Sequence, residues 1–97
     1  MLIISIDRII DFSKKHAAAR KSLSTWKATV ELAAWKKKQD VLADFPRAKM
    51  IADNRARFEI VHNTNRLIGK INYDAQTIQV RFIVTHSEYD RINAETI

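Results

Sequence analysis

The spacing of apolar residues changes at Pro46, and this change limits what the chain can fold into. Before Pro46, apolar side chains recur three or four positions apart, as they do on one face of a helix. After Pro46 they alternate with polar side chains, which is typical of β-strands. A chain of 97 residues has room for one core of about two layers. The sequence therefore predicts a single α+β domain over residues 1–97.

The N-terminal part predicts a short strand and two helices. Residues 2–4 form an apolar run typical of a strand, and Ser5 is placed to cap a helix that runs to about His16. The apolar stripe of a second helix consists of Ala19, Leu23, Trp26, Val30 and Ala33. We expect the helices to pack on the sheet that follows.

Trp35 lies outside this stripe, because at about 100° per residue it points nearly opposite Trp26. Another segment must therefore cover it. Asp40 can cap a short helical turn that carries Phe45 and stops at Pro46. We expect this turn to supply the cover and both tryptophans to belong to the core.

Three strands are predicted in the second half, over residues 57–62, 66–73 and 77–85. The links at 63–65 and 74–76 have turn-forming compositions, and links this short join antiparallel neighbours. The predicted order is β-α-α-β-β-β, with the N-terminal strand and the helices packed on one face of a mainly antiparallel, twisted sheet.

Alternation divides these strands into two faces. The side chains assigned to the helix-covered face are Phe58, Ile60, Leu67, Gly69, Ile71, Tyr73, Ile78, Val80, Phe82 and Val84. The charged side chains assigned to the other face are Arg57, Glu59, Arg66, Lys70 and Arg81. A solvated sheet face usually mixes charge signs, so this excess of cations predicts phosphate binding. The alternative is an ordinary polar surface.

The chain has 17 basic and 11 acidic side chains, and the net charge of +6 favours an anionic partner. The absence of cysteine excludes disulfides, a thiol nucleophile and thiolate zinc sites. The histidines His16, His62 and His86 lack metal-ligand spacing, so we expect neither a metal nor a cofactor. No apolar run approaches the ~20 residues of a membrane span, and we expect a cytoplasmic protein.

A series of short blocks extends over almost the entire chain. The blocks are Trp35, Asp44-Phe45-Pro46, Asn54-Arg55, Phe58-Glu59-Ile60, Asn65-Arg66-Leu67, Ile71-Asn72-Tyr73, Val80-Arg81-Phe82 and Thr85-His86-Ser87-Glu88-Tyr89-Asp90. Together they resemble the HigB toxins, which are mRNA interferases of bacterial type II toxin–antitoxin pairs in the RelE/ParE superfamily. The last block is the most specific part of the resemblance.

This resemblance implies a RelE-like fold and a ribosome-dependent endoribonuclease that cuts mRNA in the decoding site. It also implies neutralisation by a HigA-type helix-turn-helix antitoxin. The expected partners are therefore this antitoxin, the ribosome and mRNA.

Metal-free cleavage of RNA needs a base for the 2′-hydroxyl proton, positive charge on the phosphate and an acid for the departing 5′-oxygen. The cations of the second half can supply the charge. We predict catalytic roles for Arg81 and Lys70, and RNA binding by Arg55, Arg57 and Arg66. The superfamily resemblance also points to a basic residue at the position of Arg81.

Proton transfer is assigned to Tyr89 and His86. The superfamily resemblance favours a tyrosine near the C-terminus, and an imidazole can give or take a proton near neutral pH. The two roles are not divided between these residues. The alternatives are a structural His86 bonded to the backbone at a strand end, and a Tyr89 that covers apolar residues.

The lysines at 36–38 follow the second helix, and Lys36 and Lys37 are predicted to contact ribosomal RNA. The alternative is a solvated surface.

Two other classes of function stay open for the whole protein. One is a module that binds RNA or the ribosome without catalysis, and the other is a gyrase poison of the ParE type, since fold does not fix activity.

Overall fold

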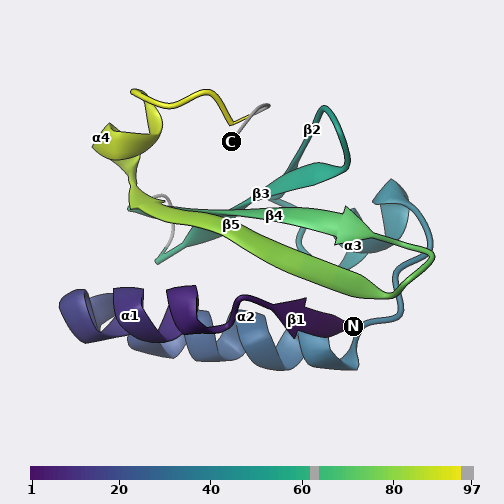
Figure 1. Cartoon of the computed structure of the whole chain (residues 1–97), viewed down its shortest axis with the longest axis horizontal. Coiled ribbons are helices and arrows are strands. Elements are labelled where there is room, and N and C mark those ends of the chain that lie inside the picture. Colours follow the sequence, from purple (N-terminus) through teal and green to yellow (C-terminus); the bar gives the residue numbers. More distant parts are fainter. Residues whose placement is uncertain (62–63, 95–97) are drawn as a thin grey trace.

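The computed structural model describes residues 1–61 and 64–94 (Figure 1). In chain order its elements are β1 (Leu2–Ile4), α1 (Asp7–Lys15), the 3₁₀ turn η1 (Ala17–Ala19), α2 (Arg20–Leu32), α3 (Lys38–Asp44), β2 (Lys49–Ile51), β3 (Arg55–Ile60), β4 (Asn65–Asn72), β5 (Thr77–Thr85) and α4 (His86–Tyr89). The α+β class predicted from the sequence is confirmed.

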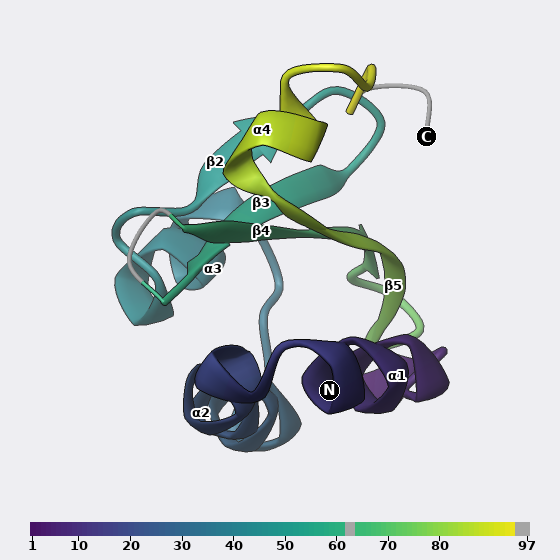
Figure 2. The same cartoon turned by 90° about the vertical axis from the view of Figure 1, so that its left-hand side faces the viewer.

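The five strands form one sheet in the order β1-β5-β4-β3-β2. β1 runs parallel to β5, and the other neighbouring strands are antiparallel. α1 and α2 cover one face of the sheet, and α4 lies over the opposite face, which we call the outer face (Figure 2). The predicted packing of the N-terminal helices on one face of a mainly antiparallel sheet is confirmed.

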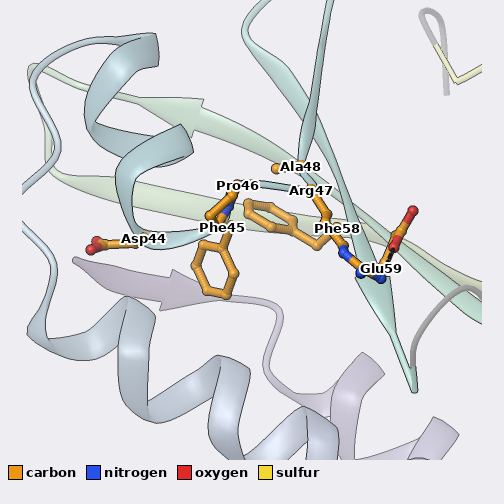
Figure 3. Close-up of a pocket in the computed structure, with 7 residues that line it drawn as sticks. All are labelled: Asp44, Phe45, Pro46, Arg47, Ala48, Phe58 and Glu59. Carbon is orange, nitrogen blue, oxygen red and sulfur yellow. Dashed lines mark ion pairs between the residues drawn. The ribbon is translucent and has the colours of Figure 1, made fainter.

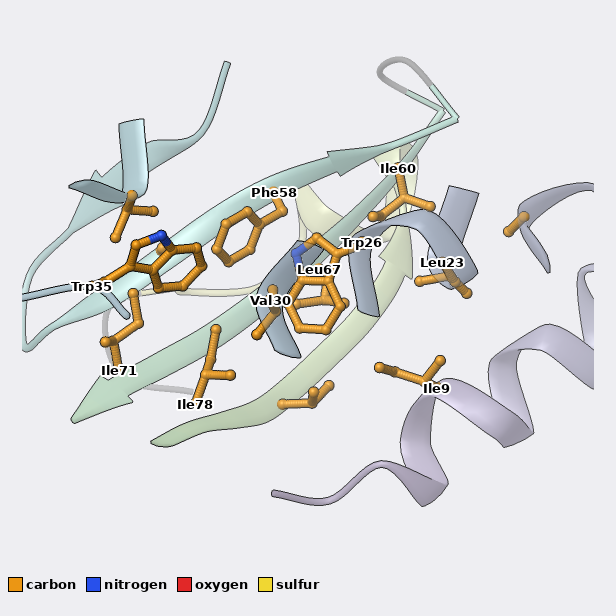
Figure 4. Close-up of a cluster of buried hydrophobic side chains, with 14 residues drawn as sticks. Ile9, Leu23, Trp26, Val30, Trp35, Phe58, Ile60, Leu67, Ile71 and Ile78 are labelled. Carbon is orange, nitrogen blue, oxygen red and sulfur yellow. The ribbon is translucent and has the colours of Figure 1, made fainter. Parts of the chain in front are cut away.

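Both tryptophans belong to the core between the helices and the sheet (Figure 4). Trp35 is 2% exposed, stacks on Phe58 with ring centroids 6.3 Å apart, and meets the edge of Phe45 at 6.0 Å. Its indole Nε1 donates a hydrogen bond of 2.8 Å to Oδ2 of Asp44. Trp26 packs edge-on against Phe58 at 5.4 Å. The predicted cover of Trp35 by Phe45 is therefore confirmed.

The predicted cap at Ser5 is wrong, whereas Asp40 does cap α3, though from inside the helix rather than from the N-cap position. Ser5 has a φ of 66°, in the left-handed region, and the residue after it is the N-cap of α1. Asp40 is the third residue of α3, and its Oδ2 accepts hydrogen bonds from the backbone N–H groups of Lys36 and Lys37 at 2.8 and 3.2 Å. The carboxylate thus satisfies N–H groups at the start of α3 from inside the helix.

The alternation pattern does not predict β2, because three residues at a sheet edge are too few for the pattern to show. β2 pairs with the first three residues of β3, and β3 therefore begins at Arg55 rather than at the predicted residue 57. The described part of β3 ends at Ile60. The predicted strand end at His62 and the predicted link residue Asn63 lie outside the described residues.

A β-bulge interrupts the pairing of β4 with β5. Ile68 pairs with Phe82, whereas the next residue, Gly69, pairs with Val80. Arg81 is therefore an extra residue on β5. A bulge of this kind shifts the alternation of the side chains that follow it.

The predicted placement of Phe82 and Val84 on the helix-covered face is wrong for this reason. Ile83 packs against the core instead and lies opposite Leu67. Val84 lies opposite Arg66, on the outer face. Period-two alternation cannot reveal an extra residue, since the residues on both sides of the bulge are apolar.

Candidate functional site

The outer face carries a group of cations from the three central strands. They are Arg55, Arg57, Arg66, Lys70 and Arg81. Cross-strand pairing places Arg55 opposite Lys70 and Glu59 opposite Arg66. The cations therefore divide between the two ends of β4.

At one end, Tyr89 lies over two guanidinium groups. The Cζ atoms of Arg66 and Arg57 are 4.6 and 5.8 Å from the centroid of its ring. Such cation–π contacts contribute about 0.5–2 kcal/mol each, more when the cation is shielded from water. Arg66 is only 8% exposed. We call these three residues the Tyr89 cluster.

The position of Tyr89 is set by the cap of α4. The Oγ1 of Thr85 accepts a hydrogen bond from the backbone N–H of Glu88 at 3.3 Å. The carboxylate of Glu88 accepts from the backbone N–H and the hydroxyl of Thr85 at 3.2 and 2.9 Å. These bonds from Thr85 hold the pKa of Glu88 below its ordinary value. The two residues form a capping box, which turns the chain from β5 over the outer face.

His86 begins this helix, one turn before Tyr89. Its backbone N–H donates to the carbonyl oxygen of Thr64 at 2.9 Å, and its Nδ1 lies 3.6 Å from Oδ2 of Asp90. The side chain is 47% exposed. The imidazole is therefore within reach of water and belongs to the same short helix as Tyr89.

Glu59 lies at the edge of this region. Its carboxylate is 3.9 Å from Arg57 and 3.9 Å from Arg47, and its side chain is 18% exposed. Beside it is a cavity of about 350 Å³, and the neighbouring rings of Phe45 and Phe58 line it (Figure 3). Glu59 is therefore engaged by two arginines between the outer face and this cavity.

At the other end of β4, Lys70 and Arg55 share one carboxylate. The Oδ2 of Asp53 accepts hydrogen bonds from Nη1 of Arg55 at 2.9 Å and from Nζ of Lys70 at 3.1 Å. The bond from Lys70, followed by that from Arg55, holds the pKa of Asp53 below its ordinary value. The Arg55 side chain is 7% exposed and that of Lys70 is 42% exposed. We call these residues the Lys70 cluster.

The structure brings together Arg57, Arg66 and Tyr89 from the predicted site, with His86 on the same helix. Lys70, which was expected beside them, contacts Asp53 instead.

Arg81 is also drawn toward the Lys70 end. Its Nη1 donates to Oε1 of Gln79 at 3.2 Å, and Gln79 pairs with Lys70. Of the two lysines predicted to contact RNA, Lys36 lines the same cavity as Lys70, whereas Lys37 is the exposed N-cap residue of α3.

Two site residues are missed by reasoning from the sequence. Asp53 lies in a turn with a φ of 62°, and its acidic side chain gave no sign of a role among cations. Lys49 lines a cavity of about 410 Å³ together with Tyr89 and Ile92. It belongs to β2, and a strand that the pattern does not predict gives no basis for assigning its residues to a face.

Within residues 1–61 and 64–94, no group of three His, Asp or Glu side chains is placed to hold a metal ion. Over the same residues, none of the helices is both long and apolar enough to cross a membrane.

A mixed five-stranded sheet, backed by helices and carrying a short C-terminal helix over its other face, is the architecture of a RelE-like toxin. The HigB_toxin family model, described as the RelE-like toxic component of a toxin-antitoxin system, matches residues 19–92. The chain belongs to this family and is the toxin component of such a system, so an antitoxin is its partner. A comparison with curated proteins gives no match.

Proposed function

We propose that this toxin is a ribosome-dependent endoribonuclease that cleaves mRNA without a metal ion. The observation that carries the proposal is the Tyr89 cluster, in which a phenol lies against two guanidinium groups on a cationic face. In the reaction, the 2′-oxygen of one nucleotide forms a bond to the adjacent phosphorus while the bond from phosphorus to the 5′-oxygen breaks. A base takes the 2′-hydroxyl proton, and an acid protonates the 5′-oxygen.

Arg57 and Arg66 stabilise the phosphate in this scheme. Negative charge increases on the phosphate oxygens in the transition state, and donors that are already fixed stabilise it without reorganising. Burial beneath Tyr89 fixes Arg66 and excludes water, which strengthens its interaction with an anion. Arg81 and Lys70 act as further cations of the same face, with Arg81 assigned to the transition state by the superfamily resemblance.

Tyr89 and His86 carry the protons. They lie one turn apart on α4, so one substrate phosphate can be near both. The two guanidinium groups lie against the ring of Tyr89, which keeps its hydroxyl close to the cations assigned to the phosphate. Asp90 lies 3.6 Å from Nδ1 of His86 and orients the imidazole. Either group can be the base, with the other as the acid.

Cleavage depends on the ribosome in this proposal, because the protein itself supplies few catalytic groups. The carboxylate of Glu59 is engaged by Arg47 and Arg57 and is poorly placed to act as a base. Positioning of the mRNA on the ribosome supplies the reactive geometry, which by itself can lower the activation barrier greatly.

A HigA-type helix-turn-helix antitoxin neutralises the toxin, and acidic segments of this antitoxin would suit the cationic outer face.

Expression of the toxin, followed by sequencing of the 5′ ends of transcripts, tests this proposal. Tyr89→Phe is the key variant, since it keeps a ring over Arg66 and removes only the hydroxyl. We expect the wild type to produce defined cuts, and the variant to produce at least about 100-fold fewer and to permit growth. Full toxicity of Tyr89→Phe at wild-type protein levels would reject Tyr89 as a proton carrier.

The same experiment separates the other classes of function. Intact messages during growth arrest would indicate a module that blocks the ribosome by binding alone. Induction of DNA-damage signalling would indicate a gyrase poison. Arg81→Ala adds a second readout, because we expect it to remove cleavage while the protein stays folded.

A further inference from the structure

The Lys70 end of the outer face contains a cavity that has no part in the proposed proton transfers. Its volume is about 630 Å³, larger than the cavity beside Tyr89. It lies where β1, β4 and β5 meet the segment before α3. The polar side chains that line it include Lys36, Asn54, Lys70, Asn72, Asp74 and Gln79.

Cations predominate in and around this cavity. Lys36 and Lys70 line it, and Arg55 lies nearby, bound to the same carboxylate of Asp53 as Lys70. Arg81 is attached to the wall through its hydrogen bond to Gln79. Together with Asp53 and Asp74, this makes four cations and two carboxylates.

Asp53 holds Lys70 in place but occupies only one of the N–H donors of its ammonium group. It accepts one bond from Nζ of Lys70, and an ammonium group has three N–H donors. The Lys70 side chain is 42% exposed, so the ammonium can also be reached by a ligand.

The neutral walls suit a nucleotide backbone. Side-chain amides at Asn54, Asn72 and Gln79 offer donors and acceptors, and Thr77 adds a hydroxyl. Proteins use such groups, together with lysine, to bind phosphate and sugar oxygens. A cavity with this lining therefore matches a ribose phosphate better than an apolar ligand.

The position of the cavity relates it to the Tyr89 cluster. Arg66 and Lys70 are four residues apart on β4 with their side chains on the same face, which corresponds to about 13 Å along the strand. Neighbouring phosphates of one nucleic-acid strand are closer together than this. An RNA strand that follows β4 would therefore meet the two ends of the face at different nucleotides.

We propose that the cavity between Lys36 and Lys70 binds a backbone phosphate and ribose of the same RNA strand that is cut at the Tyr89 cluster, more than one nucleotide from the scissile bond. This inference rests on the proposed nuclease function and extends it. The cavity holds the strand in register, and the Tyr89 cluster performs the chemistry together with His86 and Arg81.

The consecutive lysines provide a matched test. The probes are fluorescent 2′-O-methyl RNA oligonucleotides of increasing length, which cannot be cut by attack of the 2′-hydroxyl. Their binding to the purified toxin is measured by anisotropy at several salt concentrations. Lys36→Gln is compared with Lys37→Gln, since only Lys36 lines the cavity and the cap of α3 uses backbone N–H groups of both.

We expect the affinity of the wild type to rise sharply once the oligonucleotide is long enough to reach both ends of the face. Lys36→Gln should remove this rise and reduce the slope of log K against log salt by about 0.7, the contribution of one phosphate contact. Lys37 is predicted to contact ribosomal RNA but lies outside the cavity, so Lys37→Gln should leave the length-dependent rise in place. Equal effects of the two substitutions, or a Lys36→Gln effect that is the same at every length, would overturn the inference.

The result is independent of cleavage. If the length-dependent effect of Lys36→Gln is found but transcripts stay intact in cells, the nuclease proposal fails and the RNA-binding cavity stands. If transcripts are cut but Lys36→Gln and Lys37→Gln behave alike, only the cavity assignment fails.

Discussion

The Tyr89 cluster and the Lys70 cluster hold cations on the same face in different ways. In the first, Arg66 is 8% exposed and lies under an aromatic ring. In the second, Lys70 is 42% exposed and is bound by the carboxylate of Asp53. An aromatic face restrains a guanidinium without neutralising it, whereas a carboxylate cancels part of the charge. The first arrangement suits transition-state stabilisation, and the second suits ground-state binding.

The largest difference between the two clusters is expected when arginine is replaced by lysine in one and lysine by arginine in the other. Arg66→Lys keeps the charge but loses the planar group that lies against Tyr89, and we expect it to reduce cleavage of ribosome-bound mRNA by about 10–100-fold. Lys70→Arg is the matched control, and a cation at an exposed ion pair should tolerate this change within about threefold. Single-turnover cleavage rates measure both. Equal losses would show that the two clusters do not differ in role.

Gly69 lies at the bulge between the two clusters. A Cβ at this position would lie 2.7 Å from Cδ1 and 2.9 Å from Cγ1 of the fully buried Ile78. We therefore expect Gly69→Ala to lower the free energy of unfolding by about 1–3 kcal/mol, as measured by denaturant titration. Ile78→Val removes Cδ1, so the double variant should lose less than the sum of the single losses. Strict additivity would contradict the steric explanation.

The two tyrosines should respond differently to the loss of a hydroxyl. The Oη of Tyr73 is buried and has no hydrogen-bond partner within the described part of the chain, and burial raises its pKa. Tyr73→Phe removes this unsatisfied group, and we expect the free energy of unfolding to stay equal or rise by up to about 1 kcal/mol. Thermal unfolding of Tyr73→Phe measures this change, and Tyr89→Phe serves as the comparison. A clear loss of stability in Tyr73→Phe would mean that its hydroxyl is bonded in solution.

The smallest effect is expected at Asp53, since its carboxylate is exposed. Its folded-state pKa is below the ordinary value of 3.8, because Lys70 and Arg55 bind the charged form. The resulting stabilisation is complete above pH 3.8 and is lost as the pH falls through the folded-state pKa. The stability difference between the wild type and Asp53→Asn should therefore shrink only in this acidic range. A difference that is constant down to the lowest pH would exclude the ion pairs as its source.

The core could be predicted from the sequence because it follows regular periods. Trp26 and Val30 follow the helical spacing, and Phe58, Leu67 and Ile78 follow the alternation of strands. These positions depend only on the local geometry of one element. The cover of Trp35 by Phe45 could be predicted too, since an apolar residue opposite a helix face needs a neighbour.

The division of the cations could not be predicted, because it depends on contacts between segments far apart in the chain. Asp53 meets Lys70 across 17 positions, and Lys36 reaches the cavity of Lys70 from before α3. The shift at Arg81 has no signature in the sequence, because the residues on both sides of it are apolar. Sequence patterns therefore predicted which face carries the charge, and the structure shows how that charge is distributed.

The extra residue at Arg81 has a consequence for comparing this toxin with its relatives. Without the extra residue, β5 would be one residue shorter, and the residues from Phe82 to Thr85, where the chain turns into α4, would keep their present faces. A related chain with a regular strand here would have to be one residue shorter in β5. Otherwise its C-terminal helix would lie on the opposite side of the sheet. A gap opposite Arg81 in an alignment would thus mark a conserved geometry rather than an alignment error.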